Sequence, residues 1–347
     1  MPKAPLLVLA FLAALAASPA MADEARDKCL LEKLNRADPD MTVAQIKAAC
    51  DEVAPIGAAP GATIMPPKPV EQAQEPAQDS FITERRREEA QANVNRYAIT
   101  AHRPNYLLVA SYSDHRPNSE VFGAAIDAQE GDAKKVEAKF QISLKAPLAL
   151  GLFDNKVDWY AAYTERAFWQ VYNRKLSSPF RETNHEPETW LTTGVDFNVF
   201  GLQARSVALG YNHQSNGRGG KLSRSWNRIF GLIALDSGEN FAIGIRPWWR
   251  VPEKASEDDN PDIESYMGNF DITGIYRFGN GHTVDMMVRN NLRGPSQNKG
   301  ALQLGWSFPL FGHFRGYAQW FYGYGESLID YNVLQNSIGI GLQLTDW

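Results

Sequence analysis

Residues 206–227 read SVALGYNHQSNGRGGKLSRSWN, and the rest of the chain is organised around this stretch. Side chains alternate between the two faces of a strand, so Tyr211, His213 and Ser215 share one face, together with apolar neighbours. An imidazole and a hydroxyl on an apolar face are costly unless they have partners. A glycine-rich loop follows, and a second strand then begins near Asn227. The stretch therefore predicts a β-hairpin that brings a hydroxyl, an imidazole and an amide together.

These three side chains match the nucleophile, base and orienting group of a serine hydrolase. Ser215 would attack an acyl ester carbonyl, and His213 would take its proton. Asn227 would accept a hydrogen bond from the distal imidazole N–H and so fix the tautomer. A lone His-x-Ser pair on a strand is more often a hydrogen-bonded polar pair, so both interpretations stay open on these residues alone. The chain has no G-x-S-x-G motif, which argues against an α/β-hydrolase.

Beyond Asn95 the chain consists of short segments of alternating polar and apolar residues, separated by polar turns. Gly-Asn-Gly at 279–281 and Asp-Ser-Gly at 236–238 are examples of such turns. The pattern predicts twelve strands, over residues 104–113, 136–146, 156–170, 187–197, 204–215, 226–235, 240–250, 266–278, 282–291, 300–308, 315–323 and 335–345.

The last predicted strand indicates what kind of sheet these segments form. Its even-numbered positions within 338–344 hold only Ile and Leu, whereas Ser337, Gly339, Gly341 and Gln343 are small or polar. A large apolar face opposite a small, polar one is typical of a lipid-facing exterior, and bacterial barrels have even strand counts. We therefore predict an all-β fold, a transmembrane antiparallel β-barrel of about 12 strands. The alternative is a soluble β-sandwich or lipocalin-like barrel, whose apolar face would point inward.

Composition excludes some functions. The net charge of -5 over 347 residues gives no reason to propose a nucleic-acid partner. The mean hydropathy is negative, which disfavours a helical membrane protein. Outer-membrane barrels escape that test because their strands alternate between polar and apolar residues.

The N-terminus carries the pattern of a secretory signal peptide. Leu6–Ala17 is an apolar run too short to cross ~30 Å of hydrocarbon, and Ala20–Ala22 supplies a small-x-small cleavage site. After export, Cys29 and Cys50 are predicted to form a disulfide that staples a helical hairpin. The predicted organisation is a signal peptide at 1–22, the α-helical module at 23–54, a Pro/Ala-rich linker and charged lead-in at 55–95, and the barrel at 96–347.

Four separated stretches share a further resemblance. They are SSPFRETNHEP at 177–187, YNHQSNGR with SRSWN within 211–227, DDNPDIESYMG at 258–268 and YGYGESLIDYN at 322–332. Together they resemble the signature of bacterial outer membrane phospholipase A, and we call them the four signature stretches. The resemblance covers most of the chain beyond about Ala98, whereas the N-terminal module and the linker lie outside it.

The resemblance implies an enzyme of the bacterial outer membrane that hydrolyses acyl ester bonds of phospholipids, with phospholipase A1/A2 activity. It implies that the Ser-His-Asn arrangement of Ser215, His213 and Asn227 is the norm of the family and lies on the lipid-facing surface of the barrel. It assigns an oxyanion donor to the Gly217 amide.

The resemblance also implies calcium and a reversible homodimer. The Arg218 carbonyl and the Ser223 hydroxyl would bind the Ca²⁺ ion, and a third ligand, Ser177, would come from the other chain across the dimer interface. Calcium prefers oxygen ligands and keeps waters, so few carboxylates are needed. Without the resemblance, these serines would be read as turn residues.

Two positions depart from the family pattern. Gly220 stands where members of the family can carry an acid, which argues against a second calcium site involving that acid and Asp259. Glu165 stands on the strand that would line the dimer interface, where the resemblance predicts an uncharged amide. A charged group there is expected to alter the strength of the dimer or its dependence on pH.

Two other functions compete with a calcium-dependent, dimer-activated hydrolase. One is a passive barrel, a narrow pore or a scaffold, in which His213 and Ser215 form a structural pair. The other is a soluble secreted esterase. Asn227, which follows Ser223-Arg224-Ser225-Trp226, discriminates best among them, because neither a pore nor a scaffold needs it.

Overall fold

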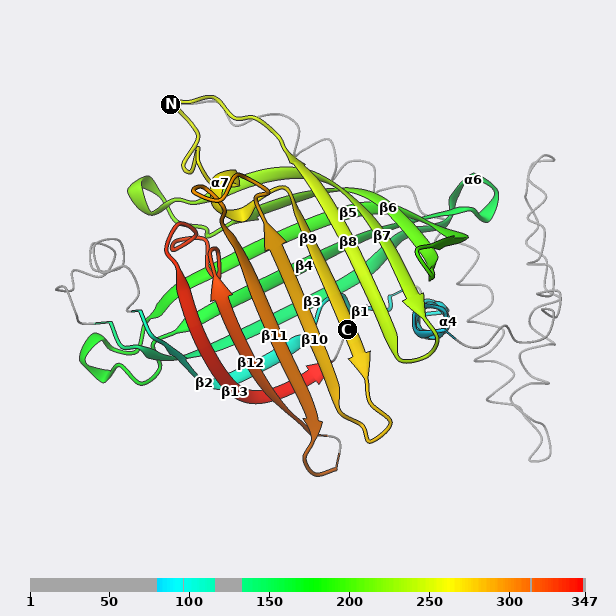
Figure 1. The fold of residues 1–347 in the computed structure, drawn as a ribbon, viewed down its shortest axis with the longest axis horizontal. Coiled ribbons are helices and arrows are strands. Elements are labelled where there is room, and N and C mark those ends of the chain that lie inside the picture. Colours follow the sequence, from blue (N-terminus) through cyan, green and yellow to red (C-terminus); the bar gives the residue numbers. More distant parts are fainter. Residues whose placement is uncertain (1–79, 96, 116–132, 313, 346–347) are drawn as a thin grey trace, which may run out of the picture. The chain divides into compact units, whose positions relative to one another are not determined.

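The computed structural model describes residues 80–95, 97–115, 133–312 and 314–345, and Figure 1 shows the arrangement of their elements. All of them belong to one compact unit, Gln74–Trp347. The predicted signal peptide, the helical module with its Cys29–Cys50 disulfide and most of the linker lie outside the described residues.

The described residues form one antiparallel sheet that closes into a barrel. Strands β2 to β13 each pair with the next strand in sequence, and β13 pairs with β2 to close a ring of twelve. The two-residue β1 pairs with β3 next to the segment of β3 that pairs with β2. The strands are β1 (Thr100–Ala101), β2 (Asn105–Ser113), β3 (Val136–Gly151), β4 (Val157–Trp169), β5 (Phe180–Val199), β6 (Leu202–Ser215), β7 (Ser225–Ser237), β8 (Phe241–Arg250), β9 (Phe270–Arg277), β10 (Thr283–Asn290), β11 (Gly300–Pro309), β12 (Arg315–Gly323) and β13 (Gln335–Thr345).

The twelve predicted strands correspond to β2 to β13, with two kinds of difference. Strands β3 and β5 are longer than predicted, because their pairing with β4 continues beyond the segments of clear alternation. The predicted strand at 266–278 is wrong at its start, since Tyr266 and Met267 belong to helix α7 (Glu264–Met267). That helix ends at Gly268, whose positive φ of 68° lets the chain turn before β9 begins.

The outward face of the barrel carries the large apolar residues, as the alternation predicts. In β13, Ile338, Ile340 and Leu344 are 61%, 55% and 68% exposed, whereas Ser337 and Gln343 are buried. An apolar exterior around a polar interior is the reverse of a soluble sheet protein. The arrangement therefore supports the membrane barrel over the soluble sandwich.

The interior of the barrel is lined by paired charges. The Arg103 guanidinium, just before β2, donates to Glu186 at 2.9 Å and to Glu188 at 2.7 Å, both on β5. Arg228 on β7 donates to Glu186 at 3.0 Å, and Arg246 on β8 donates to Glu188 at 2.6 Å. Buried charges are tolerated when they are paired in this way. These side chains line a cavity of about 720 Å³.

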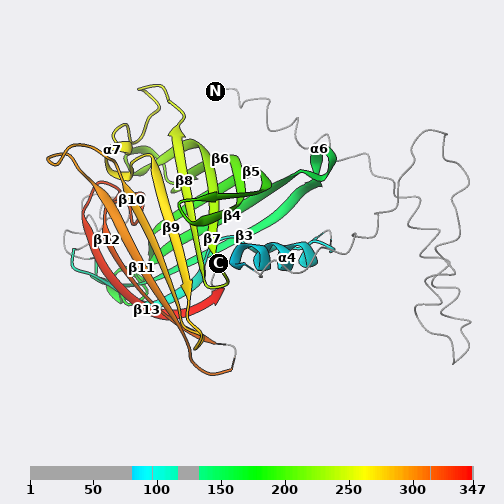
Figure 2. The same ribbon diagram turned by 45° about the vertical axis from the view of Figure 1, so that its right-hand side comes forward.

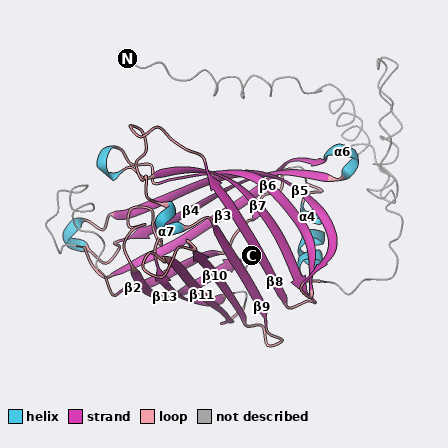
Figure 3. Cartoon of the chain, turned by 45° about the horizontal axis from the view of Figure 1, so that its top comes forward, coloured by secondary structure: helices cyan, strands magenta, loops and turns pink. Residues whose placement is uncertain are grey.

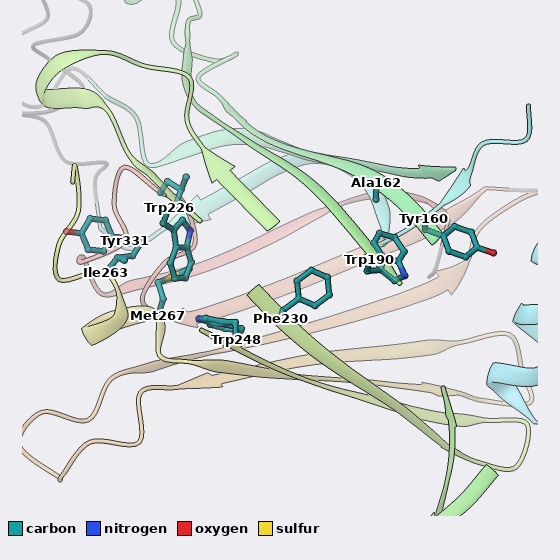
Figure 4. Close-up of a cluster of buried hydrophobic side chains, with 10 residues drawn as sticks. Tyr160, Ala162, Trp190, Trp226, Phe230, Trp248, Ile263, Met267 and Tyr331 are labelled. Atoms are coloured by element: carbon teal, nitrogen blue, oxygen red, sulfur yellow. The ribbon is translucent and has the colours of Figure 1, made fainter. Parts of the chain in front are cut away.

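An aromatic cluster packs beside these charges and fixes the inward side of β7. Trp226 is fully buried, meets Trp248 edge to face at 6.2 Å, and lies under the Arg228 guanidinium at 4.1 Å. Figure 4 shows Trp226 with Tyr331 and Met267 at one end of the cluster. Because neighbours on a strand face opposite ways, an inward Trp226 directs the next residue, Asn227, outward.

Helix α4 (Phe81–Ala92) packs against the end of the barrel where β7 turns into β8 (Figure 2). Phe81 and Ile82 are buried there, and the Ile82 amide donates to Asp236 at 3.1 Å. The Ser80 side chain caps the helix by accepting from the Thr83 amide. The charged lead-in is thus helical over Phe81–Ala92, and its helix begins with residues that join the barrel core.

Short helices occur in the connections (Figure 3). Helix α6 (Leu152–Asn155) lies between β3 and β4, and α7 lies between β8 and β9. The 3₁₀ turns η2 (Arg174–Leu176) and η3 (Gly220–Leu222) precede β5 and β7. Among the described residues, no helix is long and apolar enough to cross a membrane.

Candidate active site

The hairpin of β6 and β7 brings the predicted residues together on the outward face. His213 and Asn227 are direct cross-strand partners, and Ser215 lies opposite Ser225. The His213 Nδ1 atom is 2.9 Å from Asn227 Oδ1. Leu209, on the same face of β6, is 64% exposed, so the site opens toward the lipid-facing surface.

Two further residues set the orientation of the Asn227 amide. Its Nδ2 donates to Glu253 Oε1 at 2.9 Å, and its Oδ1 accepts from the Tyr211 hydroxyl at 2.6 Å. With Oδ1 turned toward His213, Nδ1 is the protonated imidazole nitrogen and Nε2 is left as the base. Tyr211 shares the face by alternation. Glu253 follows β8 in a loop, and no periodic pattern indicates its part in the site.

Ser215 is the last residue of β6 and lies two positions from His213 on the same face. Among the described residues, no hydrogen bond joins the Ser215 hydroxyl to His213. Catalytic hydrogen bonds often tighten only when substrate is bound, so two residues on one face without such a bond still fit a pair of nucleophile and base. Sequence and structure thus agree on the neighbourhood of the three residues, whereas only the His213–Asn227 contact is formed here.

Asn216 holds the loop that follows. It is buried, its Nδ2 donates to the Leu222 carbonyl at 2.9 Å, and its Oδ1 accepts from the Arg224 amide at 3.0 Å. The loop leaves Gly217 exposed with a φ of 65°, a left-handed conformation that favours glycine. The predicted oxyanion donor therefore lies on a braced turn directly after the proposed nucleophile.

The predicted calcium ligands lie in two places. Arg218 and Ser223 share the loop after β6, whereas Ser177 lies in the turn between β4 and β5. Within the described residues, no hydrogen bond joins Ser177 to Arg218 or Ser223. The Ser223 hydroxyl donates to Asp259 Oδ2 at 2.5 Å.

The residues of this loop fit a calcium ion. The Arg218 guanidinium donates to the Arg181 carbonyl at 2.7 Å, and no described residue donates a hydrogen bond to the carbonyl oxygen of Arg218 itself. A carbonyl, a hydroxyl and a carboxylate nearby are the oxygen donors that calcium prefers. No cluster of three or more His, Cys, Asp or Glu in the described part of the chain could hold a metal. A calcium site here must therefore include hydroxyl and carbonyl oxygens.

The two departures from the family pattern also have a place in the structure. Gly220 has a φ of 62° and no heavy atom within 4 Å of the position of a Cβ, so the loop brings no acid to that point. Glu165 faces outward on β4, where its cross-strand partner is His185 of β5. Its Oε2 lies 4.0 Å from His185 Nδ1.

The signature stretches meet at the end of the barrel opposite α4. The Leu328 amide of the fourth stretch donates to Asn184 of the first at 3.1 Å. The Tyr331 hydroxyl, also in the fourth, donates to Asp262 of the third. Burial and this hydrogen bond raise the pKa of Tyr331 well above its ordinary value. The stretches that are separated in sequence therefore form one connected region around the hairpin.

Comparison with known proteins gives the same assignment. The sequence model of the family "Phospholipase A1" matches residues 82–344. The chain is 38% identical over 256 residues to phospholipase A1 of Escherichia coli K12, which covers 74% of this chain and 84% of that protein. It is 38% identical over 254 residues to a putative phospholipase A1 of Neisseria meningitidis, which covers 72% of this chain and 65%, just under two thirds, of that protein.

Two solved structures are similar over most of the barrel. One is outer membrane phospholipase A from Escherichia coli, in an asparagine-to-alanine active-site variant, with a TM-score of 0.68, 34% identity, and coverage of 78% of this chain and 99% of that chain. The other is the outer membrane phospholipase of Salmonella typhi, a dimer with bound calcium, with a TM-score of 0.65, 35% identity, and coverage of 73% and 94%. The chain therefore belongs to the phospholipase A1 family, the hydrolases built on a twelve-stranded β-barrel of the outer membrane.

Proposed function

We propose that the chain hydrolyses acyl ester bonds of phospholipids with Ser215 as nucleophile, His213 as base and Asn227 as orienting group. The observation that carries this proposal is the 2.9 Å contact between His213 Nδ1 and Asn227 Oδ1, made by an amide that Glu253 holds in one orientation. The Escherichia coli structure is an active-site variant in which asparagine is replaced by alanine, so an asparagine also belongs to that enzyme's active site.

The proposed reaction has two halves. Ser215 Oγ attacks the ester carbonyl carbon while its proton passes to His213 Nε2, and the carbonyl oxygen becomes an oxyanion. His213 then gives the proton to the leaving alcohol oxygen of the lysolipid as the acyl-serine forms. A water molecule attacks the acyl-serine with His213 again as base. His213 then returns the proton to Ser215 Oγ as the Oγ–acyl bond breaks and the fatty acid leaves. The Asn227 side-chain carbonyl accepts from His213 Nδ1–H throughout. Unlike an aspartate, it brings no negative charge to the imidazolium.

The oxyanion needs donors or positive charge close to Ser215. The Gly217 amide, on the turn braced by Asn216, is the proposed donor. The Arg218 carbonyl and the Ser223 hydroxyl would hold a calcium ion beside it, with Ser177 of a second copy as a further ligand. Bound there, calcium would supply positive charge that favours the developing oxyanion.

A requirement for a second copy would also explain why the enzyme does not hydrolyse the phospholipids of its own membrane. A single barrel with His213 and Ser215 on its outward face meets phospholipid constantly, so a competent monomer would be harmful. In the proposed arrangement Ser177 of a second copy completes the calcium site, so the site would form only in the dimer. The Salmonella typhi relative was solved as a dimer with bound calcium, which supports this arrangement.

The proposal extends to the organisation of the whole chain. The barrel domain would occupy 96–347, preceded by the signal peptide at 1–22, the helical module with Cys29–Cys50 at 23–54 and the linker and lead-in at 55–95. Edman sequencing of the exported protein tests the cleavage site, and thiol labelling with and without reductant tests the disulfide.

The test of the triad is fatty-acid release from mixed phospholipid micelles in the presence of calcium. Ser215→Ala and His213→Ala are expected to abolish release while the barrel keeps its heat-modifiable mobility on gels. Ser225→Ala is the matched control, because Ser225 is the cross-strand partner of Ser215 and has no role in the reaction. Full activity of Ser215→Ala would refute the assignment.

The test of calcium and dimerisation uses Ser177. Ser177 has a φ of 60°, so Ser177→Gly removes the hydroxyl without adding backbone strain, and Ser177→Ala removes it with the original strain kept. Both variants are expected to weaken calcium-promoted dimerisation in sedimentation, and chelator is expected to remove activity reversibly. Constant activity per chain on dilution of a preparation shown to be monomeric would contradict the gating.

A further inference from the structure

A second histidine lies beside the proposed nucleophile on the outward face. His185 on β5 is the cross-strand partner of Ser215, and direct partners have Cβ atoms about 4.5–5.5 Å apart. The His185 side chain is about one-third exposed. A polar ring on the lipid-facing surface is costly unless its nitrogens have partners.

Only one of its two nitrogens has such a partner in the described part of the chain. The Tyr163 hydroxyl is 2.5 Å from His185 Nδ1, whereas its distance to Glu165 Oε2 is 3.5 Å, at the limit of a hydrogen bond. Because the hydroxyl lies closer to Nδ1 than to Glu165, we assign its proton to Nδ1, so that the neutral ring carries its own proton on Nε2. A protonated ring carries a proton there as well. In both states Nε2 is a hydrogen-bond donor.

This donor faces the turn that follows Ser215. His185 Nε2 lies 3.6 Å from the position that a Cβ on Gly217 would occupy, and Cδ2 lies at 3.5 Å. His185 Nε2 therefore borders the space beside the Gly217 turn, next to Ser215. An ester carbonyl under attack must lie in that space, about 3 Å from the nucleophile and from its oxyanion donors.

We propose that His185 is a further catalytic residue, whose Nε2–H donates to the oxyanion beside the Gly217 amide. The inference rests on the proposed function of Ser215. When the Ser215 Oγ–carbon bond forms, the carbonyl π electron pair moves to the oxygen, and the hydrogen bond from His185 strengthens as that charge develops. His185 keeps its proton throughout and is not a base. Tyr163 is a positioning residue, because it presents the ring with Nδ1 already occupied.

The test replaces the ring with and without its donor. His185→Phe keeps a ring and removes both nitrogens, whereas His185→Gln places an amide N–H at about the reach of Nε2. With a 4-nitrophenyl ester, which has no phosphate, His185→Phe is expected to lower kcat ~10–100-fold with little change in KM. This loss is smaller than the ~100–1000-fold of a fully enclosed donor, because the side chain is partly exposed. His185→Gln is expected to recover most of the loss.

A boronic acid that adds to Ser215 as a tetrahedral anion gives a second readout. Its affinity is expected to fall in His185→Phe by about the same factor as kcat. If that variant fails to fold, Tyr163→Phe keeps the imidazole and frees Nδ1, and a ~3–10-fold loss of kcat is expected from the ring that is no longer held.

Several results would overturn the inference. Equal losses in His185→Phe and His185→Gln would show that the ring only packs. A loss seen with phosphatidylcholine but not with the 4-nitrophenyl ester would show a contact to the phosphate instead of the oxyanion. An inactive Ser215→Ala beside a fully active His185→Phe would reject this inference alone, whereas an active Ser215→Ala would reject the proposed function.

Discussion

Glu253 offers a sensitive test of how the site is held, because it reaches the proposed base only through Asn227. Its carboxylate accepts from Asn227 Nδ2 at 2.9 Å, while Asn227 Oδ1 accepts from His213 Nδ1 and from the Tyr211 hydroxyl. If the Asn227 amide flipped, its N–H would point at His213 Nδ1. The imidazole would then carry its own proton on Nε2. That tautomer cannot take a proton from Ser215. We expect Glu253→Ala to permit this flip.

The size of the effect follows from these contacts. A hydrogen bond to a charged acceptor contributes about 1.5–3 kcal/mol, and Glu253 is only partly buried, so the lower figure applies. About 1.5 kcal/mol biases the amide slightly more than tenfold toward the productive orientation. Tyr211 and His213 can both reverse donor and acceptor roles, so without Glu253 the two orientations are about equal. We therefore expect a ~2–5-fold loss of kcat in Glu253→Ala, against ~10–100-fold in Asn227→Ala, which removes the orienting group itself.

A double-mutant cycle on fatty-acid release measures this coupling. Glu253→Gln keeps an acceptor oxygen and is the matched control, with activity near that of the unmodified chain. In the Asn227→Ala background, Glu253→Ala is expected to cause no further loss, because its only route to the reaction is gone. A full, additive loss in that background, or a loss above ~100-fold from Glu253→Ala alone, would refute the reasoning.

Three predictions concern the stability of the barrel. The first two are measured as the free energy of unfolding in urea with lipid vesicles, and the third as the rate of proteolysis. Trp226→Ala, at a fully buried position, is expected to cost ~3–5 kcal/mol, and a cost under ~1 kcal/mol would contradict the packing described. Lys139→Met leaves the buried Glu326, its partner at 2.9 Å, without its cation, and is expected to cost ~3–5 kcal/mol that the second change Glu326→Gln largely restores. No restoration would show that the ion pair is not the cause. Asp236→Ala removes the acceptor of the Ile82 amide and of Arg205 and is expected to speed proteolysis within α4, whereas an unchanged cleavage rate would show that other contacts dock the helix.

The parts of the fold that the sequence predicts are those set by local periodicity. Alternation along β13 separates Ile338 from Ser337, and the structure places them on opposite faces. The pairing of His213 with Asn227 is also local, because the two strands of the hairpin are joined by one loop. Family membership, with its outer-membrane barrel, rules out the soluble esterase.

The parts that the sequence does not predict depend on contacts between distant segments. Tyr266 and Met267 are apolar and precede a strand. The alternation pattern therefore predicts that the strand begins at Tyr266, whereas this residue belongs to α7. Glu253 and Asn216 act from loops, where no period links a residue to its partner. His185 belongs to the signature stretch at 177–187, but the sequence does not indicate that it lies next to the nucleophile. That placement follows only from the register of β5 with β6.

The ion pairs inside the barrel bear on the permeability of the membrane that holds it. Arg103, Glu186 and Arg228 join the segment before β2 to β5 and β7, and Glu188 with Arg246 joins β5 to β8. An ion passing along the axis would have to displace these bonds and cross alternating fixed charges at each step. We therefore expect the barrel to conduct ions poorly, and single-channel recording in planar bilayers would measure this. Adding copies of the enzyme to the membrane would then raise its hydrolytic capacity without raising its permeability to ions.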